Sequence, residues 1–208
     1  MDPVASRESS ARVRKRPEER REEILAEAAA IAIDEGLERI TLRAVAERLG
    51  VRPGLITHYF PAAEDLVSEA FVRAAVRERE HFFPAAGAPV ERLSRFVAHL
   101  ASGASQPLAR LWLNARHLSR FSAPLAAVLE EQDDLDRAAL IAIIQAGIDA
   151  GDFTSLDAEA ACTRILLAVD GSGSYANSAR TFDDIAGARF VADVAEWSLG
   201  LPAGSLAP

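Results

Sequence analysis

Apolar residues recur at helical spacing through most of this 208-residue chain. From Glu18 onward they lie three or four residues apart, which predicts a first helix that ends near Gly36 in a left-handed cap. A second, short amphipathic helix is predicted to begin after Thr41, whose hydroxyl can cap it, and to end at Gly50. Pro53 suits the first position of a third helix, because proline lacks the N–H group that would be unpaired there.

The rest of the chain alternates helical stretches with proline and glycine breaks. Further helices are predicted over about 62–82, 89–103, 107–121, 124–150, 157–180 and 183–199. No segment of useful length alternates apolar and polar residues as a strand does, and no repeat of solenoid period is visible. The predicted fold is therefore all-α, with about nine helices.

Composition narrows the class of protein. The lone Cys162 offers neither a disulfide framework nor a zinc cluster, which favours a reducing compartment. The polar N-terminus does not resemble a signal peptide, and no stretch of about 18 apolar residues is present. We therefore expect a soluble cytoplasmic protein with no membrane partner.

The net charge of −8 is unevenly distributed. Residues 1–60 carry as many basic as acidic side chains, so the remainder carries the whole excess of acid. The first part is thus the candidate for contact with a polyanion. Five basic residues precede Pro17 and predict a flexible arm that either contacts DNA or is simply solvated. They are Arg7, Arg12, Arg14, Lys15 and Arg16.

The second and third predicted helices, joined by a tight turn at residues 50–52, form a helix-turn-helix pattern. In that motif the first helix braces across the DNA backbone and the second enters the major groove. Apolar side chains at four positions can pack the two helices together: Val45, Leu49, Val51 and Ile56. Polar side chains outside them can reach phosphates and base edges, and Gly54 permits close approach. The alternative is two short surface helices joined by a turn.

The stretch from Arg20 to Ala70 resembles the N-terminal domain of TetR-family transcriptional regulators. The resemblance rests on an early isoleucine, on Gly36, on the Ala-x-x-Leu-Gly-Val turn and on the aromatic end of the third helix, and it covers about a quarter of the chain. The run of residues 54–60, Gly-Leu-Ile-Thr-His-Tyr-Phe, is similar to the choline-responsive BetI subgroup. The segments 111–113 and 150–153 point the same way.

The resemblance implies a double-stranded DNA operator as partner and a set of contact residues. They are Thr41, Arg43, Arg52, Pro53, Gly54, Thr57, His58 and Tyr59. One departure matters: the family usually has a lysine where this chain has Ala63. We expect the basic arm to compensate for this missing phosphate contact.

The resemblance also implies three regions: a flexible arm (1–17), a helix-turn-helix domain (18–64) and a helical ligand-binding and dimerisation domain (65–208). Small residues about four apart near the C-terminus suit a helix-helix interface, and a homodimer would read a palindromic operator. The alternative is that these residues belong to the core of one chain. The predicted interface residues are Ile165, Val169, Ser172, Ala176, Phe190, Val194 and Trp197.

A small-molecule effector is implied, which we expect to bind among polar or aromatic residues within apolar helices. The candidates are Phe96, Trp112, Asn114, His117, Phe121, Asp170, Tyr175 and Asn177. His117 and Trp112 also fit simple structural roles. Asp170 needs a partner, which can be an arginine, solvent or a cationic ligand; we favour the arginine. The acidic C-terminal part makes a cationic or amphipathic effector conceivable.

Enzymatic function is not expected. The chain lacks a Gly-x-Ser-x-Gly elbow and a phosphate loop, and its four histidines lack metal-ligand spacing. The acidic residues between 130 and 136 are interpreted as a solvated helix face. No metal and no cofactor are predicted. A second alternative is a helical interaction protein that has lost DNA recognition.

Overall fold

The computed structural model describes residues 16–155, 157–178 and 185–206, and all regular structure in these ranges is helical. Nine α-helices and two short 3-10 helices are found there, as the sequence predicted. Their bounds are α1 Pro17–Asp34, η1 Leu37–Arg39, α2 Leu42–Leu49, α3 Pro53–Tyr59, α4 Ala63–Phe82, α5 Pro89–Ala101, α6 Gln106–Leu118, η2 Ser119–Phe121, α7 Ala123–Ala150, α8 Ala158–Gly173 and α9 Ile185–Leu199.

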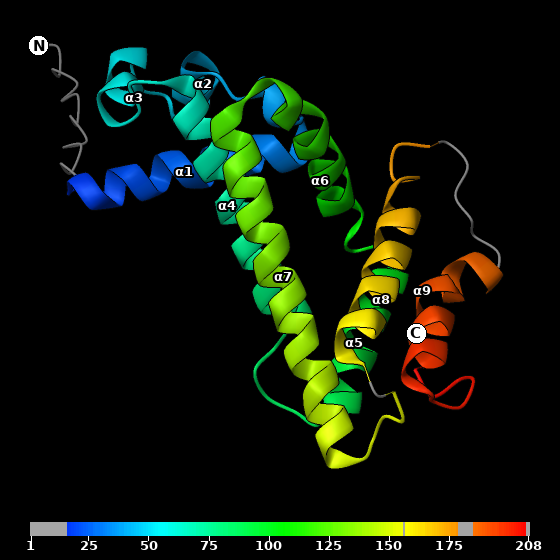
Figure 1. Cartoon of the computed structure of the whole chain (residues 1–208). Coiled ribbons are helices and arrows are strands. Elements are labelled where there is room, and N and C mark those ends of the chain that lie inside the picture. Colours follow the sequence, from blue (N-terminus) through cyan, green and yellow to red (C-terminus); the bar gives the residue numbers. More distant parts are fainter. Residues whose placement is uncertain (1–15, 156, 179–184, 207–208) are drawn as a thin grey trace, which may run out of the picture.

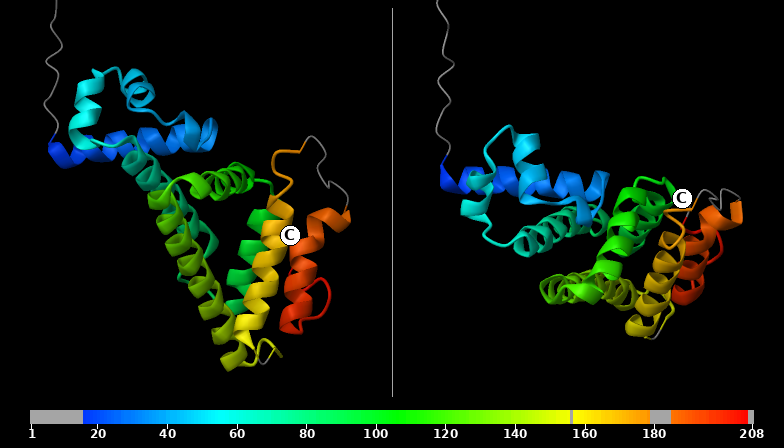
Figure 2. Two further views of the ribbon diagram at one scale, coloured as in Figure 1. Left: turned by 45° about the horizontal axis from the view of Figure 1, so that its top comes forward. Right: turned by 90° about the horizontal axis from the view of Figure 1, so that it is seen from above.

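Helices α1, α2 and α3 form one end of the molecule, and α4 leads from them into the remaining bundle (Figure 1). The long α7 packs against α4 and, on another side, against α8. Helices α8 and α9 pack together on the side of the bundle farthest from α4 (Figure 2). The predicted arm is outside the described residues as far as residue 15, and α1 begins at Pro17.

Local capping explains where the first helices begin and end. The Thr41 hydroxyl accepts a hydrogen bond from the Ala44 N–H at 3.0 Å, which confirms its predicted role as N-cap of α2. Gly50 ends α2 in a left-handed conformation with φ 62°. The cap predicted at Gly36 differs, because Gly36 has φ 108° and ψ 157° and leads directly into η1. The position still requires glycine, since φ is positive there.

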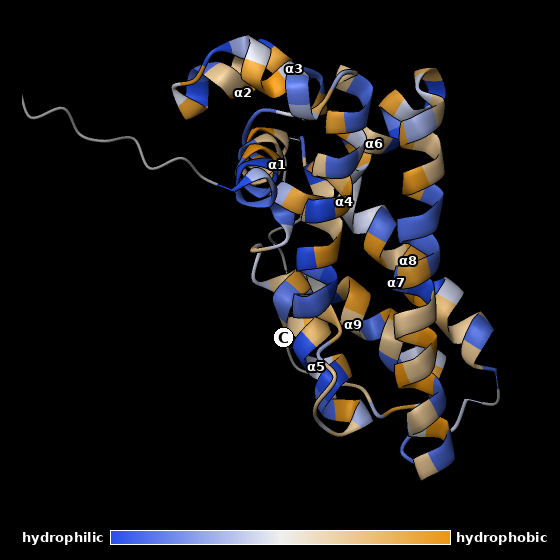
Figure 3. Cartoon of the chain, turned by 90° about the vertical axis from the view of Figure 1, so that its left-hand side faces the viewer, coloured by the Kyte–Doolittle hydropathy of each residue, from blue (hydrophilic) through white to orange (hydrophobic). Residues whose placement is uncertain are grey.

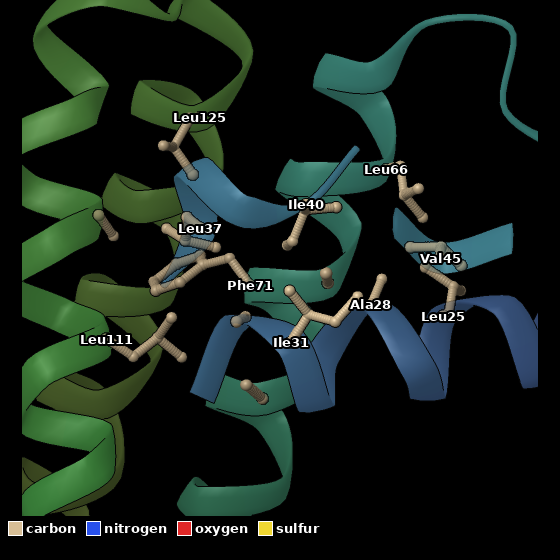
Figure 4. Close-up of a cluster of buried hydrophobic side chains, with 14 of the residues drawn as sticks. Leu25, Ala28, Ile31, Leu37, Ile40, Val45, Leu66, Phe71, Leu111 and Leu125 are labelled. Atoms are coloured by element: carbon tan, nitrogen blue, oxygen red, sulfur yellow. The ribbon is translucent and has the colours of Figure 1, made fainter. Parts of the chain in front are cut away.

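Two hydrophobic clusters hold the chain together. The first joins α1, α2, α3 and η1 to α4, α6 and the start of α7 (Figure 4). Phe71 of α4 and Ile56 of α3 are fully buried in it. Because each such side chain stabilises the fold by roughly 1.5–3 kcal/mol, α4 is firmly bound to the helix-turn-helix. The second cluster joins α5, α8 and α9 to the C-terminal half of α7.

The predicted domain boundary at residues 64 and 65 falls inside α4. The first cluster continues across it, since Leu66, Phe71 and Leu111 pack with residues of α1 and α2. Figure 3 shows hydrophobic and hydrophilic residues mixed along the helices, as expected for amphipathic elements. Within the described ranges, no helix has the length and apolarity that a membrane crossing requires.

The helix predicted over 157–180 is shorter in the structure. It ends at Gly173, and the next four residues form a turn in which the Tyr175 N–H donates to the Ser172 carbonyl. Two glycines near its end, Gly171 and Gly173, weaken the helix because glycine carries a high entropic cost there. Tyr175, Ala176 and Asn177 therefore lie in a turn rather than on a helix face.

Candidate nucleic-acid interface and cavity

The helix-turn-helix is a rigid unit. Val45 and Ile56 are fully buried between α2, α3 and their neighbours, and Leu49 and Val51 pack against the same cluster from partly buried positions. The sequence predicted this packing. It fixes α3 relative to α2, so the polar side chains of α3 keep a constant arrangement.

Seven of the eight predicted DNA-contact residues are exposed on the two helices and around the turn. They are Thr41, Arg43, Arg52, Pro53, Gly54, Thr57 and His58. Tyr59 is half-buried instead, its ring edge-on to His58 at 5.2 Å. A side chain added at Gly54 would meet no atom within 4 Å, so this position leaves open space for an approaching backbone.

Arg43 is a highly exposed cation of this face, with 83% of its side chain accessible. Its Nε donates to Glu47 Oε1 at 2.7 Å, one turn along α2. An exposed pair of this kind adds little to stability, because water screens the two charges. Arg43 can therefore leave Glu47 for a phosphate at low cost.

An ion pair connects α1 to α4, and a hydrogen bond connects η1 to α6. Arg21 of α1 forms an ion pair with Glu69 of α4 at 2.6 Å, and its guanidinium lies 4.8 Å from the Phe60 ring centroid. Asn114 of α6 accepts a hydrogen bond from the Leu37 N–H at 2.7 Å. A movement of α4 or α6 therefore reaches the helix-turn-helix through specific bonds.

A cavity of about 960 Å³ lies in the other part of the bundle, and residues of α4 to α9 line it. Four of the predicted pocket residues are among them: Phe96, Trp112, Asp170 and Tyr175. The other four do not line it. Asn114 binds Leu37, His117 and Phe121 pack edge-on at 5.8 Å with Phe121 74% exposed, and Asn177 is exposed in the turn after α8.

Charged groups in the cavity wall form two clusters. In the first, Arg116 of α6 contacts Asp170 of α8 at 2.9 Å and Asp133 of α7 at 3.3 Å. Asp170 thus has the arginine partner that the sequence analysis favoured. In the second, Arg79 of α4 forms an ion pair with Asp136 of α7. The interpretation of residues 130–136 as a solvated face is wrong for Asp136, which is partly buried; Asp133 is exposed as expected, and both line the cavity.

Burial changes the acidity of these two carboxyl groups. It raises the pKa of Asp136 to about 6, although the neighbouring Arg79 guanidinium opposes the change. Burial also raises the pKa of Asp133, against the effect of Arg116, and the nearby Asp170 adds to the increase. The cavity wall therefore holds carboxylates in an environment that disfavours uncompensated negative charge.

The predicted dimer residues occupy different environments. Ile165 is fully buried in the chain's own second cluster and offers no surface to a partner. Val169, Ser172, Ala176 and Phe190 contribute to the cavity wall. Trp197 is 71% exposed on α9, and Val194 is half-buried one turn before it.

Comparison with known families identifies one segment of the chain. Residues 24–70, which run from α1 into α4 and contain the whole helix-turn-helix, match the bacterial regulatory proteins of the tetR family. The match confirms the predicted resemblance over the helix-turn-helix segment.

Solved structures are similar to this chain in fold. A candidate transcriptional regulator from Saccharomonospora viridis, in complex with choline, has a TM-score of 0.71 at 22% identity, covering 86% of this chain and 96% of its own. A TetR transcription regulator from Haloarcula marismortui has a TM-score of 0.73 at 21% identity, with coverages of 88% and 97%. GusR of Salmonella enterica has a TM-score of 0.70 at 19% identity, covering 89% of this chain and 98% of its own. No curated protein sequence matches the chain.

Sequence reasoning missed several cavity residues of this chain. Phe82 and Phe83 line the cavity at the end of α4, and Arg116 lies one turn after Trp112. The i, i+3 spacing of Asp133 and Asp136 was the available signal, because it places both carboxylates on one face of α7. Among the described residues, no group of three or more candidate ligands could hold a metal ion.

Proposed function

We propose that this protein is a transcriptional regulator of the TetR family, a dimeric repressor that binds a palindromic operator and changes its DNA affinity when a small molecule enters the cavity. The observation that carries the proposal is the position of α4. Its first half is embedded in the core of the helix-turn-helix through Leu66 and Phe71. Phe82 and Phe83 at its other end line the cavity.

A helix shared by both sites supplies the coupling. A ligand that binds one orientation of α4 better than another shifts the population toward it, by as much as its affinities for the two differ. The effect is reciprocal, so operator DNA must weaken ligand binding by the same factor. Arg79 connects α4 to Asp136 in the cavity wall, so a change in the orientation of α4 would alter this contact.

The exposed faces of α8 and α9 support dimerisation. Leu167 of α8 is 67% exposed, and Trp197 of α9 is 71% exposed. The Arg164 guanidinium lies 5.2 Å from the Trp197 ring centroid. Large apolar side chains grouped on one surface typically mark an interface. A two-fold axis there would allow two α3 helices to lie about 34–36 Å apart, the spacing of successive major grooves.

The effector class we propose is a small cationic or amphipathic molecule, in line with the BetI-like subgroup. The aromatic and acidic lining of the cavity supports this class. The S. viridis protein was solved with choline, which makes choline a natural first compound to test.

The deciding experiment is fluorescence anisotropy on DNA from upstream of the protein's own gene, at several salt concentrations, with scrambled DNA as control. We expect selective binding whose affinity falls steeply with salt, because bound phosphates release counterions. Arg52→Ala should weaken binding, whereas Arg95→Ala on α5 should not. Weak binding that is insensitive to salt and sequence would instead favour a protein-interaction role.

A further inference from the structure

The guanidinium of Arg116 occupies a place built for a cation. Its two terminal nitrogens contact different carboxylates, Asp170 at 2.9 Å and Asp133 at 3.3 Å. Its central carbon lies 5.6 Å from the ring centroid of Trp112, over the ring. All four residues line the cavity, and they come from three helices, α6, α7 and α8.

We propose that Arg116 is a tethered occupant of a cation site formed by Trp112, Asp133 and Asp170, and that the cavity's ligand is an organic cation that displaces it. The inference rests on the proposed function and its cationic effector, and it adds the place in the cavity where the positive group binds and the residue with which it competes. The positive group of the ligand would lie against Trp112 and the two carboxylates, and its apolar part against the aromatic wall.

The charges of the cavity wall select a cation over an anion. Among the described residues, three carboxylates but only one guanidinium line it, the third carboxylate being that of Asp136. An anion binding to Arg116 would have to replace two carboxylates and would then lie beside their two uncompensated negative charges, which repel it. A cation leaves both carboxylates compensated after the exchange. Aromatic faces attract cations as well.

The exchange is feasible because Arg116 can leave. About 37% of its side chain is exposed, so the guanidinium can turn into solvent without breaking the fold. Its two ion pairs are partly exposed, and pairs of this kind contribute little net stability. The incoming cation would therefore displace it at a small cost.

Displacement of Arg116 would release a connection between helices. Arg116 joins α6 to α7 and α8, and Asn114, two residues earlier on α6, accepts the hydrogen bond from Leu37 of η1. An organic cation would thus remove one connection of α6 to α7 and α8, at a point adjacent to the bond of α6 with the helix-turn-helix. This gives the cavity a second route to the DNA-binding end, besides α4.

The test measures binding of choline and of ethylguanidinium by calorimetry, without DNA. We expect Arg116→Gln to bind both cations at least about tenfold more tightly than the wild-type protein, because the internal competitor is gone. Arg120→Gln is the matched control: Arg120 lies 5.7 Å over the exposed Phe121, outside the cavity, and its removal should change nothing. The neutral isostere 3,3-dimethylbutan-1-ol should not gain affinity from R116Q.

The double variant D133N/D170N tests the same site without altering Arg116. It should lose affinity for both cations by at least about tenfold. The proposal is overturned if R116Q binds the cations no more tightly than R120Q, or if D133N/D170N binds them as well as the wild type. Should choline bind as expected yet leave DNA affinity unchanged, the cation site stands and the proposed regulation fails. If another ligand releases the protein from DNA but neither cation binds, the proposed regulation stands and the cation site is refuted.

Discussion

Arg79 of α4 donates hydrogen bonds to Asp136 of α7 and to both oxygens of Gln132, at 3.2 Å for the carbonyl and 2.8 Å for Oε1. The Gln132 side chain is 2% exposed, so this cluster lies inside the bundle. It joins the helix shared with the helix-turn-helix to the longest helix of the cavity wall. The Asp136 carboxylate is therefore both a structural partner and a titratable group within the candidate coupling path.

The raised pKa of Asp136 predicts a pH-dependent stability. A free aspartate has a pKa of about 3.9, and Asp136 titrates at about 6 in the folded chain. Between these values the folded state binds more protons than the unfolded state, so the free energy of unfolding must fall as pH rises from about 4 to 6. In urea unfolding, the free energy of unfolding of the wild-type protein should fall by about 2–3 kcal/mol relative to that of Asp136→Asn over this range. It should fall no further at higher pH.

The matched control is Asp134→Asn, since Asp134 is exposed two residues earlier on α7. Its stability profile should run parallel to that of the wild type. A wild-type profile parallel to that of D136N from pH 4 to 7 would contradict the assignment of the titration to Asp136. The groups that act on this carboxyl are Arg79, Asp133 and Glu78.

Gly147 and Gly171 provide a paired test of packing. Both lie in helices, but a Cβ at Gly147 would come within 2.1 Å of the Phe153 ring, whereas one at Gly171 would meet no atom within 4 Å. Phe153 is 3% exposed and has little room to move. Gly147→Ala should therefore lower the free energy of unfolding by about 1–3 kcal/mol. Gly171→Ala should raise it by about 0.5–1 kcal/mol, and urea unfolding measures both.

Helix boundaries were predictable from sequence where a local signal sets them. Thr41, Gly50 and Pro53 act through their own hydroxyl, positive φ or missing N–H, and each was assigned its position correctly. The end of α8 was not, because glycines such as Gly171 weaken a helix without forbidding it. No local signal in residues 171–176 predicts a turn rather than a continuing helix.

The cavity was harder to predict because its lining depends on which face of each helix turns inward. Asn114 resembles a pocket residue by pattern, but its partner is Leu37, 77 residues earlier. Asp133 and Asp136 belong to an acidic run whose pattern is that of a solvated surface. Only the packing of α7 against α4 and α8 shows that part of the run faces the cavity.

The α8 and α9 face predicts a separable effect on assembly. Leu167→Glu places a charge on an exposed apolar patch, where burial in a dimer would leave it unpaired. Size-exclusion chromatography with light scattering should give a monomer at micromolar concentration, with unchanged far-UV circular dichroism. Phe121→Glu is the control, because Phe121 is equally exposed but lies on η2. A dimeric L167E would place the interface elsewhere.

Ala63, the first residue of α4, is exposed beside the helix-turn-helix, and it stands where the resemblance to TetR-family regulators implies a lysine. If the basic arm replaces that phosphate contact, deletion of residues 1–16 should weaken operator binding and Ala63→Lys should strengthen it. Each phosphate contact that is gained or lost should change the slope of log affinity against log salt concentration by about 0.9.

The effects of the deletion and of A63K should also be non-additive, because both act on the same phosphate. The deletion should therefore lower DNA affinity less in the A63K background than in the wild type. Equal costs in both backgrounds would mean that the arm binds DNA independently of α4, and no cost in either would remove the arm from the interface.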